Sequence, residues 1–311
     1  MVENPMDVLR LCPVRKSRTQ KQSFRDAVIP YFTSRGYAVT VEKGKLGAKN
    51  IVIGNPETAR YLVTAHYDTP AALPFPNLIT PCSLLPYIGY QALLTLLIFA
   101  VALVPGILLA FAGVSAEKAG LTWGISLYVI LALMLFGPAN KNNANDNTSG
   151  VVTLMEIARS MPEAHRKDVC FVLFDLEEAG LIGSSSYRKA HKKQTNHQIV
   201  LNLDCVGDGD ELLIFPTKAM KKDAAKMAAI RSITRIVGTK RLAVRVSGFA
   251  YYPSDQKNFP YGVGFAAFRR SKRAGLYLGR IHTSKDTVLD ETNVNILRAA
   301  IVSLITCHAV N

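Results

Sequence analysis

Apolar and polar residues follow two different patterns along this chain. On either side of a central segment, short continuous apolar runs such as 169–174 alternate with stretches such as 149–161, where apolar residues recur at helical spacing. The first pattern predicts strands buried on both faces, and the second predicts amphipathic helices. The central segment breaks this alternation, because 69–116 and 119–140 contain no Asp, Glu, Lys or Arg. The chain therefore predicts an α/β domain interrupted by an unusually apolar insertion.

The alternation of strands and helices predicts the fold class. Continuous apolar strands separated by helices are typical of a sheet whose two faces are both covered. We expect an α/β fold, a three-layer α/β/α domain with a mixed, mostly parallel sheet, formed by residues 1–81 and 140–311. The expected strands lie within 37–43, 50–55, 61–68, 167–178 and 197–207, and the expected helices lie within 18–34, 149–161, 223–238 and 291–310, with another opening at 179–187.

The central insertion, 82–139, predicts a transmembrane helical hairpin. Spanning a bilayer takes about 20 apolar residues in a helix, and the runs 84–111 and 119–139 both reach that length. The alternatives are a buried helical pair or an apolar arm for dimerisation, but a soluble arm needs a polar outer face, which neither run has. Lys118 is the only basic residue of the connecting loop, whereas the flanking chain is rich in Lys and Arg. The positive-inside rule then predicts that both termini and the α/β domain are cytoplasmic.

The net charge and the cysteine content indicate which binding partners and which cellular compartment to expect. The net charge of +14 indicates an anionic partner such as a membrane surface or an acidic substrate. Nucleic acid is not expected, because no basic stripe interleaved with aromatic residues and no zinc-finger spacing occurs. The five cysteines form no CxxC, which is typical of free thiols in a reducing compartment. Residues 1–24 lack an apolar core, so we expect no secretory signal peptide there.

Histidines and carboxylates collect at the predicted strand ends. Each alone has an ordinary explanation, such as a core histidine, a helix N-cap or a solvated strand end. Together they predict a divalent metal site, because clustered carboxylates repel one another unless cations lie between them. A mixture of imidazole and carboxylate ligands without thiolates suits zinc. The residues concerned are His66, Asp68, Asp146, Glu177, Glu178, Asp204 and His282.

The pair His66 and Asp68 carries a further prediction. Residues two apart in a strand point to the same face. Asp68 can therefore accept the second ring N–H of His66 and fix the tautomer of the imidazole, as carboxylates commonly do beside metal-bound histidines.

The order of these motifs resembles the co-catalytic dizinc aminopeptidases of the aminopeptidase Y and bacterial leucyl aminopeptidase type. Over 18–80 and 140–308 the chain contains HxD, DNxSG, EExGxxGS, a strand-end Asp and HTxxDT in that order. The same fold family includes glutamate carboxypeptidases, glutaminyl cyclases and the transferrin receptor. The resemblance implies a zinc-exopeptidase-like domain that holds two zinc ions.

The resemblance also implies a role for each motif residue. Glu177 would be the general base, and Asp68 would be the second catalytic residue. Five residues would be zinc ligands, with Asp146 bridging the ions: His66 and Asp204 complete one site, and Glu178 and His282 complete the other.

Three further residues are candidates for substrate binding: Gln256, Arg269 and Arg270. Gln256 lies in SDQKNF (254–259), where members of the resembled family often have SDHxxF, so a glutamine replaces the histidine. The basic segment 268–275 would grip a substrate carboxylate. The alternative for this segment is a solvated loop attracted to anionic lipid.

Together with the hairpin, the resemblance implies a membrane-embedded zinc exopeptidase, with aminopeptidase as the expected class, that uses a metal-bridging water at the cytoplasmic face. Peptide or amide substrate and lipid bilayer are the expected partners. The alternative is a metal-dependent amidase acting on lipidated peptides or N-acyl amino acids, because the insertion leaves the chain directly beside the site. A glutaminyl-cyclase-like transferase fits less well, since its best-known members use a single zinc. A receptor without activity also fits less well, because the ligand set is complete. Whether the insertion is an anchor or a route for substrate stays open.

Overall fold

The computed structural model describes residues 2–246 and 248–307 and is built around one mixed sheet. The strand order is β1-β2-β4-β3-β5-β9-β6-β8-β7, with β10 paired to β9. In the centre, β4, β3, β5 and β9 are parallel neighbours, and antiparallel pairs lie on both sides of them. The strands are β1 Val39–Lys43, β2 Lys49–Ile53, β3 Tyr61–His66, β4 Val169–Phe174, β5 Ile199–Leu203, β6 Glu211–Pro216, β7 Arg235–Val237, β8 Lys240–Val244, β9 Gly262–Ser271 and β10 Gly275–Tyr277.

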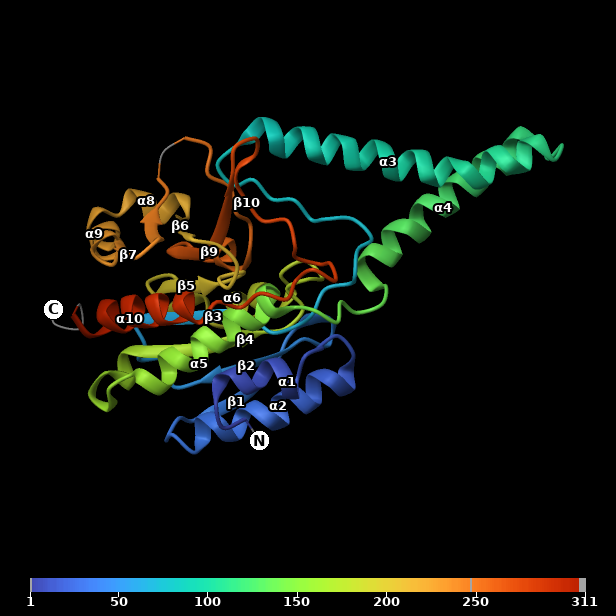
Figure 1. Ribbon diagram of the computed structural model, residues 1–311. Helices are drawn as coiled ribbons and strands as arrows, with labels where there is room; N and C mark the ends of the chain where they lie inside the picture. The colour runs from blue at the N-terminus through green and yellow to red at the C-terminus, as the bar shows by residue number, and fades with distance from the viewer. Residues whose placement is uncertain (1, 247, 308–311) are drawn as a thin grey trace.

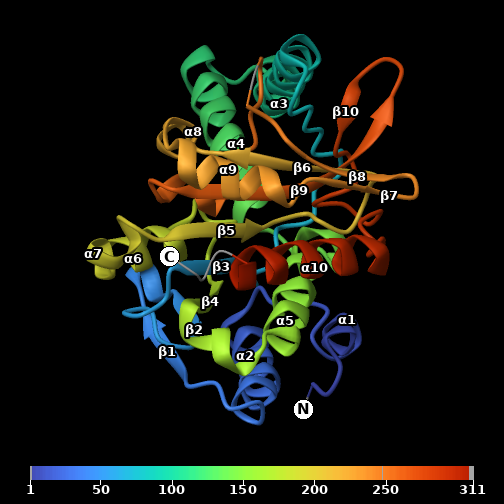
Figure 2. The same ribbon diagram turned by 90° about the vertical axis from the view of Figure 1, so that its left-hand side faces the viewer.

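Helices cover the sheet and also extend away from it (Figures 1 and 2). Figure 1 shows α3 and α4 projecting from the α/β body, while α2, α5 and α10 lie along the sheet. The helices are α1 Val8–Leu11, α2 Arg18–Thr33, α3 Leu84–Phe111, α4 Ala116–Phe136, α5 Gly150–Ser160, α6 Ile182–Ala190, α7 Lys192–Thr195, α8 Lys218–Lys222, α9 Ala224–Ser232 and α10 Glu291–Cys307. The predicted α/β fold with helices on both faces of a mixed sheet is confirmed.

Strand β4 explains why the central strands read as unbroken apolar runs. Phe171 and Leu173 belong to a large apolar cluster with residues of α2, α5 and α10, whereas Val172 and Phe174 join a second cluster with Tyr187 of α6. Alternate residues of a strand point to opposite faces, so a strand covered on both sides must be apolar throughout. The core therefore lies on both sides of the parallel centre of the sheet.

One predicted helix is wrong in its second half. Residues 223–238 were expected to form a single helix, but α9 ends at Ser232 and Arg235–Val237 form β7, which pairs with β8. Val237 pairs with Lys240 across a two-residue turn, and Gly238 in that turn has φ 58°. Glycine adopts this left-handed conformation at little cost, so a hairpin forms where helical spacing alone suggested continuation. The strands β6, β8, β9 and β10 were also not expected, and residues 308–310 of the last predicted helix lie outside the described part of the chain.

The insertion contains two helices within the predicted range 82–139. Their length and composition would allow each to cross a bilayer, and their apolar side chains are largely uncovered: Leu85 is 83% exposed, Phe111 87% and Phe136 74%. A helix from a soluble core would be mostly buried, so these surfaces call for an apolar environment. The two helices contact each other closely at Gly106, where an added Cβ would lie 2.7 Å from the Ala119 carbonyl oxygen.

Candidate metal centre

The parallel centre of the sheet brings the predicted ligands to one edge. His66 is the last residue of β3 and pairs in register with Phe174, the last residue of β4. Asp204 directly follows β5, the other neighbour of β3. Because parallel strands all end at the same edge, the segments that follow them converge there. The sequence places Glu177 and Glu178 three and four positions after the end of β4, within reach of this edge.

Asp146 lies between two imidazoles. Its Oδ1 is 3.2 Å from Nε2 of His66, and its Oδ2 is 3.0 Å from Nε2 of His282. Each oxygen of one carboxylate thus faces a different histidine. Asp204 Oδ1 lies 3.7 Å from the same nitrogen of His66, and Glu178 Oε2 lies 3.5 Å from the same nitrogen of His282. The arrangement consists of two donor sets that share Asp146.

These two sets are compact enough to hold metal ions. In one, His66, Asp146 and Asp204 bring their donor atoms within 4.8 Å of one another, and in the other Asp146, Glu178 and His282 do the same. They coincide with the two ligand sets that the resemblance implied, although the roles themselves remain predictions. Glu177 forms a further group with His66 and Glu178. Nitrogen and carboxylate oxygen without thiolate are the donors of a catalytic zinc site, so the residues fit this metal.

Asp68 lies beside three parts of the cluster at once. Its Oδ1 is 3.4 Å from Nδ1 of His66 and accepts the backbone N–H of Glu177 at 3.0 Å, while its Oδ2 accepts the backbone N–H of Glu178 at 3.2 Å. The carboxylate is buried, at 3% exposure. Asp68 therefore sets the backbone position of both glutamates and lies close to the ring of His66, but Nδ1 of His66 makes no hydrogen bond in the described part of the chain, so the orientation of the ring by Asp68 stays a prediction.

The electrostatics of the cluster call for a cation. Burial raises the pKa of Glu177 and of Glu178 well above the usual range of a glutamate, and neighbouring carboxylates raise both further. Burial acts in the same direction on Asp146, but hydrogen bonds with His282 and His66 outweigh it and bring the pKa of Asp146 below its usual range. Buried carboxylates that repel one another become stable as anions when positive charge lies between them.

Asp175, which directly follows β4 and precedes Glu177 by two positions, belongs to the scaffold of the site. Its Oδ1 lies 2.5 Å from Nζ of Lys21, which is buried on α2, and its Oδ2 accepts the backbone N–H of Lys49 at 3.0 Å.

Three non-glycine residues beside the cluster have a left-handed backbone conformation: Leu176 has φ 56°, Cys205 has φ 55° and His282 has φ 61°. Non-glycine residues in this conformation carry strain and are concentrated at functional sites.

Three supporting residues were given no role by sequence reasoning, although the sequence had already placed Asp286 among the polar residues at the strand ends. Asn147 donates to Leu203 O at 2.9 Å and accepts from the backbone N–H groups of Gly150 and Cys205, which ties the end of β5 to the start of α5. Asp286 accepts the backbone N–H groups of Asn145 and Asp146 at 2.8 and 3.0 Å. Arg15 is fully buried and donates to Tyr67 O, Cys12 O and Thr148 Oγ1. Asn147 belongs to the DNxSG motif and Asp286 to the HTxxDT motif, so the sequence marked both positions without revealing their structural role. No local pattern marks Arg15.

Asp255 is a fourth residue without a sequence-based role. It is fully buried, and neither carboxylate oxygen has a hydrogen-bond partner in the described part of the chain. Burial raises the pKa of Asp255 to about 7, and its charge contributes to the raised pKa of Glu177. The SDQKNF motif that contains it could have drawn attention to this residue.

The side chains of the three predicted substrate-binding residues form hydrogen bonds or ion pairs with other residues of the chain. The side-chain amide of Gln256 donates to Tyr252 O at 2.7 Å and accepts from Asn202 Nδ2 at 3.1 Å. Nε of Arg269 lies 2.7 Å from Asp208, and a terminal nitrogen of Arg270 lies 2.5 Å from Glu211. Contact with substrate therefore remains a prediction for all three.

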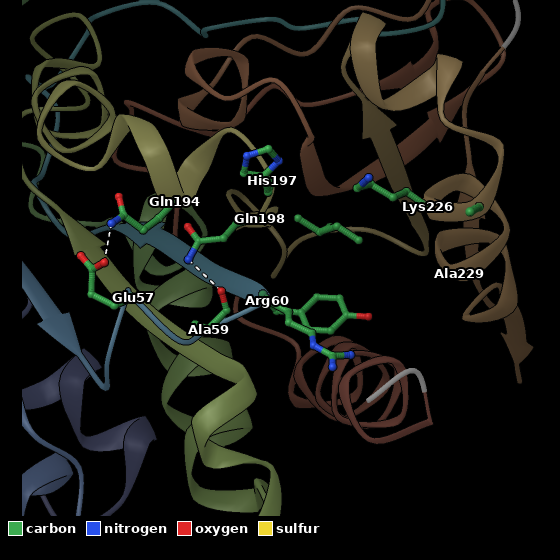
Figure 3. A pocket seen from close by; sticks show the side chains of 11 residues that line it. Glu57, Ala59, Arg60, Gln194, His197, Gln198, Lys226 and Ala229 are labelled. Atoms are coloured by element: carbon green, nitrogen blue, oxygen red, sulfur yellow. Dashed lines mark hydrogen bonds between the residues drawn. The ribbon is translucent and has the colours of Figure 1, made fainter. Parts of the chain in front are cut away.

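A separate pocket of about 600 Å³ lies at the amino ends of β3 and β5, at the edge of the sheet opposite the cluster (Figure 3). Gln194 donates to Glu57 and Gln198 donates to the carbonyl oxygen of Ala59 on its wall. Ligand-forming groups of histidine and carboxylates, within the described residues, occur only at the other edge. The groups that could hold a metal ion therefore lie at the carboxyl ends of the strands.

Comparison with known proteins agrees with this geometry. Aminopeptidase YwaD of Bacillus subtilis is 39% identical over 67 residues, which are 21% of this chain and 15% of YwaD, so the chain matches only a small part of that curated relative. A glutaminyl cyclase of Porphyromonas gingivalis superposes with a TM-score of 0.61 at 16% identity, covering 98% of this chain and 97% of that one. A Zn-dependent exopeptidase of Parabacteroides distasonis gives 0.61 at 16% identity, covering 97% of each chain. LapB of Legionella pneumophila gives 0.58 at 15% identity, covering 99% of this chain and 73% of LapB. These likenesses establish the fold. The sequence model of Peptidase family M28 matches residues 130–304, more than half of the chain, and the chain therefore belongs to peptidase family M28.

Proposed function

We propose that the chain is a zinc-dependent aminopeptidase that is anchored in a membrane by α3 and α4. The observation that carries the proposal is the position of Asp146, whose two oxygens face the two histidines His66 and His282. Such a carboxylate suits a bridge between two metal ions. Membership of a peptidase family and similarity to YwaD and to a Zn-dependent exopeptidase support peptide hydrolysis.

Two zinc ions would be held by the two donor sets. His66, Asp146 and Asp204 would hold one, and Asp146, Glu178 and His282 would hold the other. Zinc in such a site acts as a Lewis acid that polarises the scissile carbonyl and lowers the pKa of water.

Glu177 would act as the general base and then as the general acid of the reaction. Its backbone N–H is fixed by Asp68, and its carboxylate lies beside the cluster without belonging to the two sets that share Asp146. An anionic Glu177 would take a proton from the attacking water and then deliver it to the amine that leaves. The adjacent glutamates would thus divide the work, with Glu178 binding metal and Glu177 remaining free for proton transfer.

The Glu177→Gln variant tests this division. Glutamine keeps the shape of the side chain but cannot accept the proton, so we expect turnover to be lost while zinc content, measured by elemental analysis, stays at the wild-type level. Loss of zinc from this variant would show that Glu177 is a ligand instead.

The products formed from different substrates distinguish an aminopeptidase from an amidase. Detergent-purified protein is incubated with free and N-blocked peptides and with N-acyl amino acids, and products are identified by mass spectrometry. Cleavage of free-amine peptides alone supports the aminopeptidase. Activity confined to acyl conjugates would establish the amidase, and cyclisation of N-terminal glutamine would place the chain with the glutaminyl cyclases.

The membrane anchoring is supported by the exposed apolar surfaces of α3 and α4 and by the scarcity of basic residues between them. We infer that the loop 112–115 lies outside and the α/β domain inside the cell. A membrane-impermeant maleimide should label the Ser115→Cys variant in intact cells, whereas the exposed native Cys307 should react only after permeabilisation. Labelling of Cys307 in intact cells would show that the α/β domain lies on the outer side of the membrane, opposite to the inferred topology.

A further inference from the structure

An apolar cleft lies between the two helices of the insertion and the α/β domain. It has a volume of about 560 Å³ and is lined by the loop 72–75 and Pro138, by Leu97, Ile98 and Val101 of α3, and by Ile130, Leu133 and Met134 of α4. Every lining residue is apolar. A peptide backbone needs hydrogen-bonding groups around it, so this cleft suits a hydrocarbon chain.

The cleft is tied to the candidate metal centre through the backbone. The N–H of Leu73 donates to the carbonyl oxygen of His282 at 2.8 Å, and the N–H of Ala72 donates to the carbonyl oxygen of Pro138 at 2.8 Å. The loop 72–75 begins four positions after Asp68 in the sequence. In Figure 1 this loop, the end of α4 and the segment before α10 lie on the same side of the sheet. One wall of the cleft, the loop 72–75, is therefore hydrogen-bonded to His282 and follows Asp68 closely in the sequence.

The cleft is also open to the surroundings of the insertion. Leu97 and Val101 are each 52% exposed and Leu133 is 57% exposed, although all three line it. If α3 and α4 lie in a bilayer, these side chains face lipid, and a hydrocarbon chain can pass from the bilayer into the cleft without crossing water.

We propose that this cleft holds a long alkyl chain attached next to the scissile amide of the substrate. The chain can be an N-acyl group or the lipidated side chain of the first residue, since both offer the same hydrocarbon to the same walls. The proposal rests on the proposed hydrolase function and adds to it a substrate class. The insertion then serves as a binding wall as well as an anchor.

Chain length gives the first test. Two series of amide substrates, one N-acylated and one with a free amine and an S-alkylated first residue, carry chains of increasing length. For substrates presented from water, below the concentration at which they enter micelles, each methylene that enters the cleft should raise kcat/KM by about fourfold until the cleft is full. The series that shows this rise identifies the source of the chain. A flat profile in both series, with short peptides still cleaved, overturns this inference and leaves the proposed function intact.

Blocking the cleft gives the second test. The Val101→Trp and Ile98→Trp variants should lower kcat/KM for the substrate with the longest chain at least tenfold. They should leave kcat/KM for the substrate with the shortest chain unchanged. Leu108→Trp, on an exposed position of α3 outside the lining, is the matched control and should change neither. Equal loss for short and long substrates in both cleft variants would refute a specific role in binding the chain.

A binding measurement separates this inference from catalysis. Zinc-loaded Glu177→Gln protein, which is expected not to turn over, is irradiated with a peptide whose alkyl chain carries a diazirine, and labelled peptides are mapped by mass spectrometry. Labelling of 97–101 and 130–134 that is lost in Val101→Trp supports the cleft even if no substrate is hydrolysed. Labelling that persists in both tryptophan variants, or that spreads evenly over α3 and α4, overturns it.

Discussion

Replacing Asp68 with asparagine tests how the cluster is held together. The carboxylate accepts the backbone N–H groups of Glu177 and Glu178 with different oxygens and also faces Nδ1 of His66. Asparagine has the same shape but only one acceptor oxygen, and its amide NH₂ then faces one of the two backbone N–H groups. One buried donor therefore loses its partner, and the backbone of one glutamate shifts.

The expected loss follows from the hydrogen bonds involved. A hydrogen bond to a charged group contributes about 1.5–3 kcal/mol, which corresponds to a fall in kcat/KM of roughly 10- to 150-fold if it positions Glu177 in the transition state. Changes in groups that orient a metal ligand also weaken metal binding by about 10- to 100-fold. Both losses should appear together in Asp68→Asn.

The assay separates these two losses. Peptide hydrolysis is measured as a function of free zinc, so that the apparent zinc affinity and kcat/KM at saturating zinc are obtained independently. Asp26→Asn, an exposed change on α2, is the matched control and should alter neither quantity. If zinc-saturated Asp68→Asn keeps kcat/KM within threefold of the wild type, the assigned positioning of Glu177 is refuted.

Two further predictions concern the scaffold of the site. Lys21→Met leaves Asp175 buried without its partner and should lower the free energy of unfolding by about 3–5 kcal/mol, measured by urea unfolding of the purified protein. The double variant Lys21→Met/Asp175→Asn should recover part of that loss, and a double variant no more stable than Lys21→Met would contradict the pairing. Gly150→Ala should destabilise by about 1–3 kcal/mol or more, because its Cβ would lie 2.4 Å from the carbonyl oxygen of Leu203. An unchanged melting temperature of Gly150→Ala would show that α5 can move away from β5.

The sequence predicted the convergence of the ligands because their positions follow from sheet topology. His66 and Asp204 end neighbouring parallel strands, so recognising buried strands was enough to bring them to one edge. The HxD spacing likewise predicted the approach of Asp68 to His66, because an extended chain directs residues two apart to the same side, although β3 itself ends at His66. Such inferences need only local periodicity and the rule that parallel strands end together.

The remaining contacts depend on tertiary placement that local patterns do not encode. Arg15 hydrogen-bonds with residues more than fifty positions away, and nothing in the polar N-terminal segment distinguishes it from Lys16 or Arg18. The ion pair of Arg269 with Asp208 likewise depends on the packing of the segment after β5 against β9. The strand at 235–237 was missed because helical spacing continued through it, and the hairpin with β8 overrode this local preference.

Anomalous diffraction at the zinc absorption edge, from crystals of the purified zinc-loaded protein, tests the central claim most directly. The account predicts two zinc peaks per chain, about 3.5–4 Å apart, with one oxygen of Asp146 directed at each. A single peak, or two peaks that do not share Asp146, would contradict it.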